Sequence, residues 1–169
     1  MSGKRYYHAS VVLDGKIYAM GGYDGGTRDT VEVYDPQADS WQRVASMLRG
    51  LSDHAAAVMG GKIYVTGGEP NLGSPVNSVY VYDPQADAWT QLASMGIARR
   101  YHASAAVGGK LYVFGGRGGD DEYLSTAEVR LVTCAQLYGG SRSLSAVTAR
   151  SLILYRRLLH HFALRAGAG

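Results

Sequence analysis

The stretch HAAAVMGGKIYVTGG, residues 54–68, decides the fold of this chain. Two short apolar runs flank Gly60-Gly61, and glycine tolerates the positive φ that a two-residue hairpin turn requires. A second glycine pair ends the second run. The stretch therefore predicts an antiparallel hairpin with strands over residues 55–59 and 62–66.

The same pattern occurs three times in the chain. The first copy runs from His8 to Gly22 and the third from His102 to Gly116, and each ends on a glycine pair. The copies are offset by 46 and then by 48 residues. Self-similarity at a period of this size is the signature of a repeat architecture, in which each unit buries its apolar faces against its neighbours.

Each unit is predicted to form short antiparallel strands. The first two strands of the three units are expected over residues 9–13 and 16–20, 55–59 and 62–66, and 103–107 and 110–114. A third strand, over 31–34 or 79–82, ends at Asp-Pro, where proline stops the ladder, and a fourth carries Trp41 or Trp89. A four-stranded antiparallel sheet repeated in this way is a blade of a β-propeller, stacked face to face on the next blade.

The spacing of the aromatic residues identifies the kind of repeat. Each glycine pair of the first two units is followed by a tyrosine 12 or 14 residues later, and by a tryptophan seven residues after that. This arrangement resembles the kelch repeat, over residues 5–129, in units of about 5–48, 49–96 and 97–129. The motif positions are Gly21, Gly22, Tyr34, Trp41, Gly67, Gly68, Tyr82, Trp89, Gly115 and Gly116. We expect the tyrosines and tryptophans to pack between blades, with their polar tips on backbone partners.

The resemblance ends inside the third unit. Residues 125–129 align with a third strand, but Arg130 stands at the motif tyrosine and Leu137 at the motif tryptophan. The third blade is therefore predicted to lack the end of its third strand and all of its fourth. The predicted fold class is all-β: a partial kelch β-propeller, an open arc of two full four-stranded blades and an incomplete third. Open blade edges of this kind favour self-association.

The remaining segment, residues 130–169, differs in composition from the repeats. It holds six arginines and no acidic residue, whereas residues 1–129 hold 11 basic and 14 acidic residues. Residues 151–165 have the apolar spacing of an amphipathic helix, which would suit a membrane surface or an acidic partner. The favoured alternative is a segment that is no selected part of the fold, produced by splicing or a frame change, because the break falls inside a strand. The tail is thus expected to be helical or disordered.

Several kinds of partner are not expected. The repeats are mildly acidic, which gives no reason to expect nucleic acid, and no stretch is apolar for long enough to span a membrane. The chain has a single cysteine, Cys134, and no apolar leader follows its first residues. A lone cysteine favours a reducing compartment, so the expected location is cytoplasmic.

No metal site, cofactor or catalytic residue is predicted. His8, His54 and His102 occupy the same place in successive units, so they are spread around a ring and a structural role is expected. Some kelch propellers are copper oxidases or sialic acid mutarotases. The oxidases use a tyrosine crosslinked to a cysteine, and Cys134 lies outside the repeats. The chain is therefore predicted not to be an enzyme.

The candidate binding residues lie in the loops that vary most between units. Because adjacent strands alternate in direction, the loop before the first strand and the loop after the second emerge on the same face. Variable loops on a constant scaffold form a recognition surface, with tyrosine and arginine as frequent anchors. The candidate residues for binding a protein or peptide are Tyr7, Tyr23, Arg28, Asp53, Glu69, Asn71, Arg100, Tyr101 and Arg117, with Arg5 and Arg99 nearby.

The resemblance also implies a function. The repeats look most like the C-terminal repeats of kelch-like proteins, in which a BTB domain engages cullin-3 and the propeller recruits a substrate for ubiquitination. We therefore expect a protein-interaction module, a fragment of the substrate-recognition propeller of such an adaptor. The alternative is an actin-binding cytoskeletal module, and an enzyme such as a sialic acid mutarotase is the least favoured hypothesis.

Overall fold

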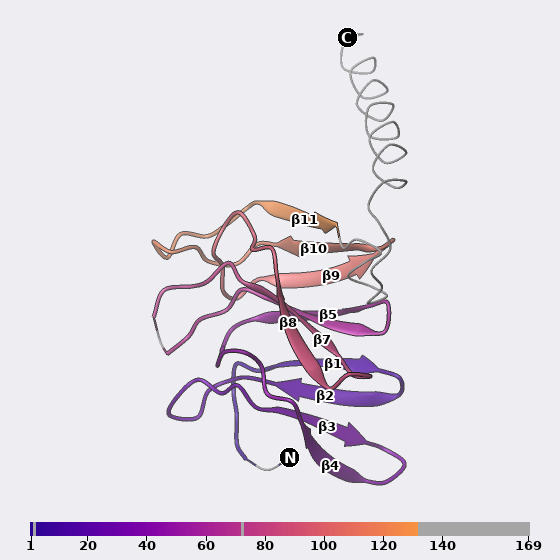
Figure 1. Cartoon of the computed structure of the whole chain (residues 1–169). Coiled ribbons are helices and arrows are strands. Elements are labelled where there is room, and N and C mark those ends of the chain that lie inside the picture. The colour runs from indigo at the N-terminus through magenta and orange to yellow at the C-terminus, as the bar shows by residue number, and fades with distance from the viewer. Residues whose placement is uncertain (2, 72, 132–169) are drawn as a thin grey trace. The chain divides into compact units, whose positions relative to one another are not determined.

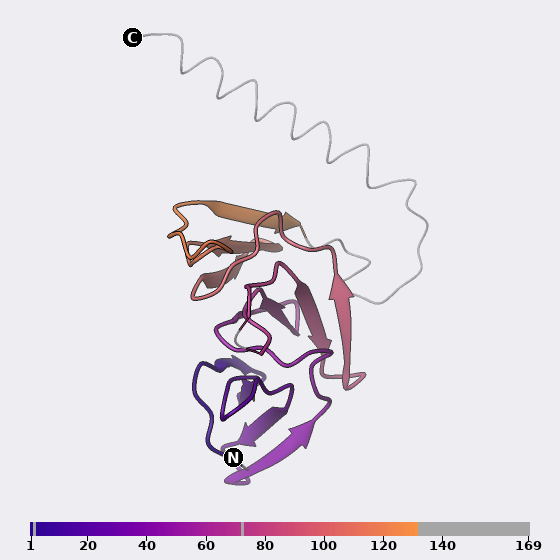
Figure 2. The ribbon, with the colours of Figure 1, turned by 90° about the vertical axis from the view of Figure 1, so that its left-hand side faces the viewer.

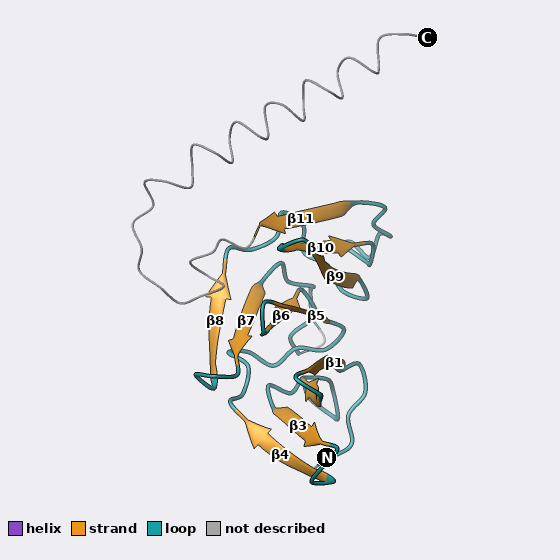
Figure 3. Ribbon diagram, turned by 90° about the vertical axis from the view of Figure 1, so that its right-hand side faces the viewer, coloured by secondary structure: helices purple, strands orange, loops and turns teal. Residues whose placement is uncertain are grey.

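The structure, a computed structural model, describes residues 1, 3–71 and 73–131. In this part of the chain it consists of strands and connecting loops, arranged as three antiparallel sheets that follow one another along the chain (Figures 1 and 3). We refer to these sheets as blades 1, 2 and 3. Within the described residues no helix is long and apolar enough to cross a bilayer. The predictions for residues 132–169, including the helix over 151–165, lie outside the described residues.

Every strand of the three blades is five residues long. Blade 1 has the order β1 (Ala9–Leu13), β2 (Lys16–Met20), β3 (Val31–Asp35), β4 (Ser40–Val44). Blade 2 has the order β5 (Ala55–Met59), β6 (Lys62–Thr66), β7 (Val79–Asp83), β8 (Ala88–Leu92). Blade 3 contains β9 (Ala103–Val107), β10 (Lys110–Phe114) and β11 (Ala127–Leu131), with β10 in the middle. The predicted all-β partial propeller, with two four-stranded blades and an incomplete third, is confirmed.

The predicted hairpins form because their turn residues adopt the required backbone. Gly60 and Gly61 have φ values of 59° and 71°, which a primed two-residue turn needs and which glycine adopts without steric cost. The turn places Met59 opposite Lys62 and Val58 opposite Ile63. This register puts alternate side chains on opposite faces of the blade, and both faces are apolar.

Blade 3 differs from the sequence prediction in one detail. Its third strand was expected to end before Arg130, yet β11 pairs with β10 through Arg130, opposite Leu111, and Leu131, opposite Lys110. The prediction of a shortened strand is wrong, because a strand ladder is made by backbone groups and does not require the motif tyrosine at this position. The prediction that blade 3 lacks its fourth strand concerns the residues after Leu131 and lies outside the described residues.

The hydrophobic core lies between the blades. The first strand of blade 2, β5, lies next to both β1 and β9, as the labels of Figure 3 show, and Figure 2 shows the three blades in succession from the opposite side. One buried cluster joins blade 1 to blade 2, with Tyr18 and Tyr82 rings 6.1 Å apart, and a second joins blade 2 to blade 3 through Tyr64 and Leu111. Blade 2 is therefore covered on both faces, which explains why its strands are the most deeply buried.

Glycine and histidine form the tightest contact between blades. A Cβ placed on Gly21 would lie 2.6 Å from His54 Cε1, and one placed on Gly67 would lie 2.6 Å from His102 Cε1. His54 and His102 thus each pack directly against the first glycine of the glycine pair in the preceding blade, and both rings are buried. No group of three or more potential metal ligands occurs in the described part of the chain.

The outer strand of blade 2 is fastened to blade 1 by side chains. Trp89 Nε1 donates to the Ala45 carbonyl at 2.9 Å, and the Ala45 N–H donates to Asp87 Oδ1 at 2.8 Å. The predicted backbone partner is found for Trp89. For Tyr82 that prediction is wrong, because its hydroxyl donates to Asp87 Oδ1 at 2.7 Å.

Candidate protein-binding surface

The loops before the first strands and after the second strands lie together at one end of the blades. Isolated backbone bridges join Tyr6 to Tyr23 in blade 1, Ser52 to Glu69 in blade 2, and Arg100 to Arg117 in blade 3. We refer to this end as the loop face; it comprises residues 5–8 and 21–30, 51–54, 67–71 and 73–78, and 99–102 and 115–126. The loops of all three blades therefore contribute to one surface.

Tyr7, Asp53 and Tyr101 form a row across the three blades. The Asp53 N–H donates to the Tyr7 carbonyl at 2.9 Å, and the Tyr101 N–H donates to the Asp53 carbonyl at 3.0 Å. The Tyr7 and Tyr101 rings lie 6.3 Å apart at 77°, and each side chain is about half exposed. We refer to these three residues as the Tyr-Asp-Tyr row. It presents two aromatic rings and one carboxylate to solvent at a fixed spacing.

The backbone of this row is strained in the same way at each position. The φ values are 58° at Tyr7, 56° at Asp53 and 54° at Tyr101. A positive φ is uncommon for a residue other than glycine, and for a bulky side chain it persists only where surrounding contacts enforce it. The hydrogen bonds between blades supply that enforcement, so the direction of each side chain is set by the packing of the blades.

Arg100 holds Tyr101 in place and joins blade 2 to blade 3. Its guanidinium forms ion pairs with Asp121 and with Glu69, and it lies 5.5 Å from the centre of the Tyr101 ring. Hydrogen bonds to Asp121 and Glu69 raise the pKa of Arg100, and the bond from Arg100 lowers the pKa of Asp121. Because Glu69 is buried, it positions Arg100 and is not itself open to a partner.

The environment of Asp53 favours a hydrogen bond or ion pair from a partner to its carboxylate. Burial raises the pKa of Asp53; a hydrogen bond from the Ser52 hydroxyl, 3.0 Å long, opposes the rise, and the nearby Glu69 carboxylate adds to it. A partly desolvated carboxylate gains more than an exposed one from a donor or cation brought by a partner. The Asp53 backbone is hydrogen-bonded to the backbone of both Tyr7 and Tyr101, so its carboxylate belongs to the same surface as their half-exposed rings.

A pocket of about 310 Å³ opens beside Tyr101. It is lined by Tyr101, Gly116, Arg117 and Tyr123, and Arg117 stacks on the Tyr123 ring at 5.2 Å. Tyr123 is 85% exposed. The sequence prediction named Arg117 but not Tyr123, although Tyr123 lies in the same variable loop and only its aromatic character could have identified it.

The other candidates occupy the outer loops of blades 1 and 2. Tyr23 packs on Tyr6 with ring centres 5.4 Å apart, and Arg28 pairs with Asp24. Asn71 Oδ1 accepts a 2.8 Å hydrogen bond from the Thr27 hydroxyl, which ties the blade 2 loop to blade 1. Thus Tyr7, Asp53, Arg100, Tyr101 and Arg117 line the Tyr-Asp-Tyr row and its pocket, while Tyr23, Arg28 and Asn71 belong to the outer loops.

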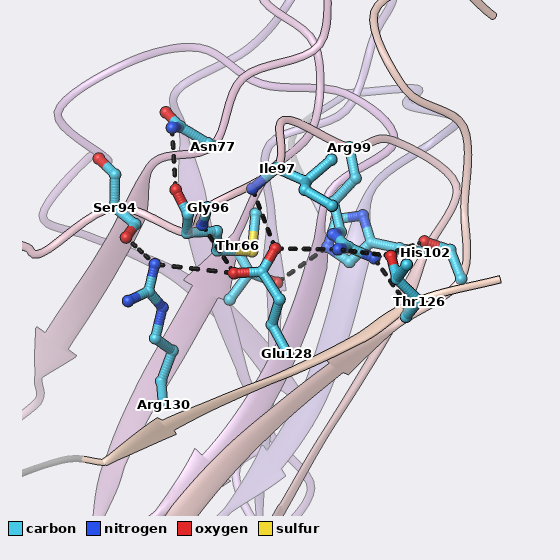
Figure 4. A network of polar contacts seen from close by, with 12 residues as sticks. Thr66, Asn77, Ser94, Gly96, Ile97, Arg99, His102, Thr126, Glu128 and Arg130 are labelled. Atoms are coloured by element: carbon cyan, nitrogen blue, oxygen red, sulfur yellow. Dashed lines mark hydrogen bonds and ion pairs between the residues drawn. The ribbon is translucent and has the colours of Figure 1, made fainter. Parts of the chain in front are cut away.

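The two arginines expected near this surface are structural. Arg99 is fully buried and donates from Nη1 to the Gly115 carbonyl at 2.9 Å and from Nη2 to Glu128 Oε1 at 2.9 Å (Figure 4). Arg5 makes the equivalent bonds in blade 1, to the Gly21 carbonyl and to Glu32. Arg5 and Arg99 thus lie near the candidate residues, as expected, but the guanidinium of each is bonded to carbonyls and a glutamate of its own blade.

Comparison with known proteins agrees with the fold and these motifs. A family model described as the KLHDC2/KLHL20/DRC7 Kelch-repeats domain matches residues 2–116. Kelch-like protein 23 of Mus musculus is 42% identical over 69 residues, and kelch-like protein 6 of Homo sapiens is 46% identical over 68 residues. Each alignment covers 40% of this chain but only 12% and 11% of the two relatives, so the chain spans a small part of their length.

Proposed function

Because the chain belongs to the kelch-repeat family, we propose that its loop face binds a protein or peptide partner. The observation that supports this most is the Tyr-Asp-Tyr row, where three blades place two half-exposed rings and a carboxylate at fixed positions. Tyrosine is enriched among the residues that dominate binding energy, because it contributes a large apolar area and a hydroxyl with little conformational entropy.

The chemistry of the row suits a peptide that carries a donor or a cation. Asp53 offers an acceptor whose pKa is raised by burial, and Tyr7 and Tyr101 flank it with aromatic surface. A lysine, arginine or backbone amide of a partner, placed beside Asp53, would compensate its carboxylate and contact the exposed surface of the adjoining tyrosine rings. The partner segment is therefore expected to be extended, with a basic or amide group near its centre.

A displayed peptide library, selected on the purified chain, tests the proposal. Peptides that bind should lose about 30-fold in affinity with Tyr101→Ala, the loss of about 2 kcal/mol expected of a hot-spot tyrosine. The matched control is Gln85→Ala, in the exposed turn between β7 and β8 at the opposite end of blade 2, which should leave affinity unchanged. Circular dichroism verifies that both variants fold; binding unaffected by Tyr101→Ala would contradict the site.

We further propose that the parent protein is a substrate adaptor of a cullin-3 ubiquitin ligase. The support is the similarity to kelch-like proteins, which is limited to a short segment of each. A protein partner selected through the loop face should then be ubiquitinated in cells, and blocking cullin-3 should stop it. Ubiquitination that persists without active cullin-3 would contradict the adaptor role.

The cytoskeletal alternative makes a different prediction. An actin-binding module would cosediment with actin filaments, and Tyr101→Ala would not need to affect that binding. Cosedimentation of the chain with actin filaments, if the library peptides do not inhibit it, would favour the alternative. A sialic acid mutarotase would instead accelerate the exchange of the sugar anomers, which can be followed directly by NMR.

A further inference from the structure

The described blades leave two apolar sheet faces without a neighbour. Ile63 and Tyr82 of blade 2 pack against blade 1, and the equivalent positions in blade 1 are Ile17 and Tyr34, which face away from blade 2. We refer to this surface of blade 1 as the leading face; it carries Val12, 64% exposed. The opposite surface of blade 3, the trailing face, carries Val107, Phe114 and Val129.

The seam between blades 1 and 2 contains three backbone hydrogen bonds. The Leu51 N–H donates to the Arg28 carbonyl at 3.1 Å, and the Gly22 N–H donates to the Leu51 carbonyl at 2.8 Å. The Asp53 N–H donates to the Tyr7 carbonyl at 2.9 Å. Two of these donors belong to the later blade and one belongs to the glycine pair of the earlier blade.

The seam between blades 2 and 3 repeats these bonds at equivalent positions. The Arg99 N–H donates to the Val76 carbonyl at 3.2 Å, and the Gly68 N–H donates to the Arg99 carbonyl at 2.9 Å. The Tyr101 N–H donates to the Asp53 carbonyl at 3.0 Å. The same three hydrogen bonds therefore recur at each seam. The sequence offset between units predicts which backbone groups would form them at a further seam.

The trailing face and the leading face carry the backbone groups that would form one more such seam. Blade 3 offers the Leu124 carbonyl, the Gly116 N–H and the Tyr101 carbonyl, while blade 1 offers both backbone groups of Arg5 and the Tyr7 N–H. Within residues 3–71 and 73–131, none of these six groups is hydrogen-bonded to another backbone group. Each donor on one face has an acceptor at the equivalent place on the other.

The histidine contact is split between the same two faces. His8 is exposed, whereas His54 and His102 are buried on the glycine of the preceding blade. Gly115, the equivalent of those glycines, has φ of 69° and only the Leu124 carbonyl, 3.9 Å away, near an added Cβ. Among the described residues, His8 of blade 1 thus has no glycine of a preceding blade packed against it, and Gly115 of blade 3 has no histidine of a following blade packed against it.

From this complementarity we propose that the leading face of blade 1 docks on the trailing face of blade 3 of a second copy of this chain. The new seam would repeat the three backbone hydrogen bonds, and His8 would pack against Gly115 of the second copy. The counterpart of Ala45 in blade 3 is residue 141, outside the described residues, so Trp41 is not assigned a bond in this seam.

The number of copies follows from closure of the ring. A head-to-tail contact forms a ring when its rotation closes and an open filament when it does not. Propellers contain about four to eight blades, and the only multiple of three blades in that range is six. Two copies joined by two identical seams would therefore complete a ring, and the proposal depends on the seam and not on the function of the loop face.

Light scattering after size-exclusion chromatography of the full chain tests this directly. The wild-type chain should have twice the 18.1 kDa mass of one copy. Val107→Asp should reduce it to a single copy, because an aspartate would be buried unpaired in both seams. The control is Leu48→Asp, which replaces an equally exposed apolar residue, 58% against 65%, in the connection between blades 1 and 2.

Mixing two defective variants separates head-to-tail docking from other arrangements. Val12→Asp damages only the leading face and Val107→Asp only the trailing face, so each variant alone should be monomeric. Their mixture retains one intact seam and should form a heterodimer. A variant that still dimerises alone would show docking between identical faces, and a wild-type monomer at all concentrations would show that no second copy is bound; either result overturns the proposal.

Amide hydrogen exchange gives a reading at the seam itself. Exchange at Tyr7 and Gly116 should slow as the chain concentration rises, whereas exchange at Gly22 and Gly68, which are already bonded within one copy, should not change. Association that leaves Tyr7 and Gly116 unprotected would contradict the proposed seam, even if the mass were that of two copies.

Discussion

Gly67 and Gly115 occupy the same place in blades 2 and 3, but only Gly67 has a neighbouring blade against it. Both have positive φ, 57° and 69°, so alanine at either position costs about 1–2 kcal/mol in backbone strain. At Gly67 the added Cβ would also meet His102 Cε1 at 2.6 Å, which adds about 1–3 kcal/mol of overpacking. Urea denaturation of the monomeric chain should thus show a clearly larger loss of stability for Gly67→Ala than for Gly115→Ala. Equal losses would mean that the glycine is required only for its conformation.

The buried histidines make the stability of the chain depend on pH. Burial, followed by the proximity of His102 and His8, lowers the pKa of His54 to about 4, and burial, followed by Arg99, lowers that of His102 to about 4. Below pH 6.5 the unfolded chain then binds more protons than the folded chain, so the free energy of unfolding falls as the pH falls. We expect a loss of about 2 kcal/mol for each histidine between pH 7 and pH 5.

Two variants assign this dependence to particular rings. His54→Gln should remove about half of the change in unfolding free energy between pH 7 and pH 5, as measured by urea denaturation at each pH. His8→Gln should remove much less, because His8 is exposed and water solvates its charged form. A pH dependence that survives in His54→Gln unchanged would show that other groups cause it.

At the scale of whole elements, Asp87 fastens the outer strand of blade 2 to blade 1. It accepts hydrogen bonds from the Ala45 N–H and the Tyr82 hydroxyl, and these bonds lower its pKa. Asp39, the equivalent residue of blade 1, has the same φ of 46° and a bond from the Tyr34 hydroxyl, 2.6 Å long. Asp87→Ala should therefore destabilise the chain by about 0.5–1.5 kcal/mol more than Asp39→Ala, because it also removes the solvent-exposed hydrogen bond from the Ala45 N–H. Thermal unfolding of the pair measures the difference, and equal effects would mean that the strand is held by packing alone.

The strands could be predicted from the sequence because their signals are local. Glycine pairs fix the hairpin turns and alternation fixes the register, so the first two strands of every unit fall where the pattern places them. The end of β11 could not be predicted from the motif, since Arg130 continues the backbone ladder without the motif tyrosine. The loop face was harder, because side chains there are placed by neighbouring blades. Nothing in the spacing distinguishes Arg99, buried against Glu128, from Arg100, which lies beside Tyr101.

The central blade shows why neighbours, and not single units, determine this fold. The position held by Arg5 in blade 1 and Arg99 in blade 3 is Leu51 in blade 2, and Tyr80 replaces the paired glutamate. Leu51 and Tyr80 are both buried in the cluster between blades 1 and 2. Equivalent positions thus hold an ion pair in blades 1 and 3 and an apolar pair in blade 2. The ion pair satisfies its charges internally, whereas the apolar pair packs into the core between blades 1 and 2. A unit of this kind has no stable core of its own and acquires one from both sides.

At the scale of the whole molecule, the open leading and trailing faces should make stability depend on concentration. If a second copy covers both faces, association stabilises the folded chain by mass action, and the midpoint of thermal unfolding should rise with protein concentration. Val107, 65% exposed, lies on the trailing face and contributes nothing to the seams within one copy. Val107→Asp should therefore leave the midpoint at low concentration unchanged and abolish its rise, whereas Leu48→Asp should preserve the rise. Differential scanning calorimetry over a hundredfold range of concentration measures both, and a wild-type midpoint that stays constant over that range would show that the apolar faces remain uncovered in solution.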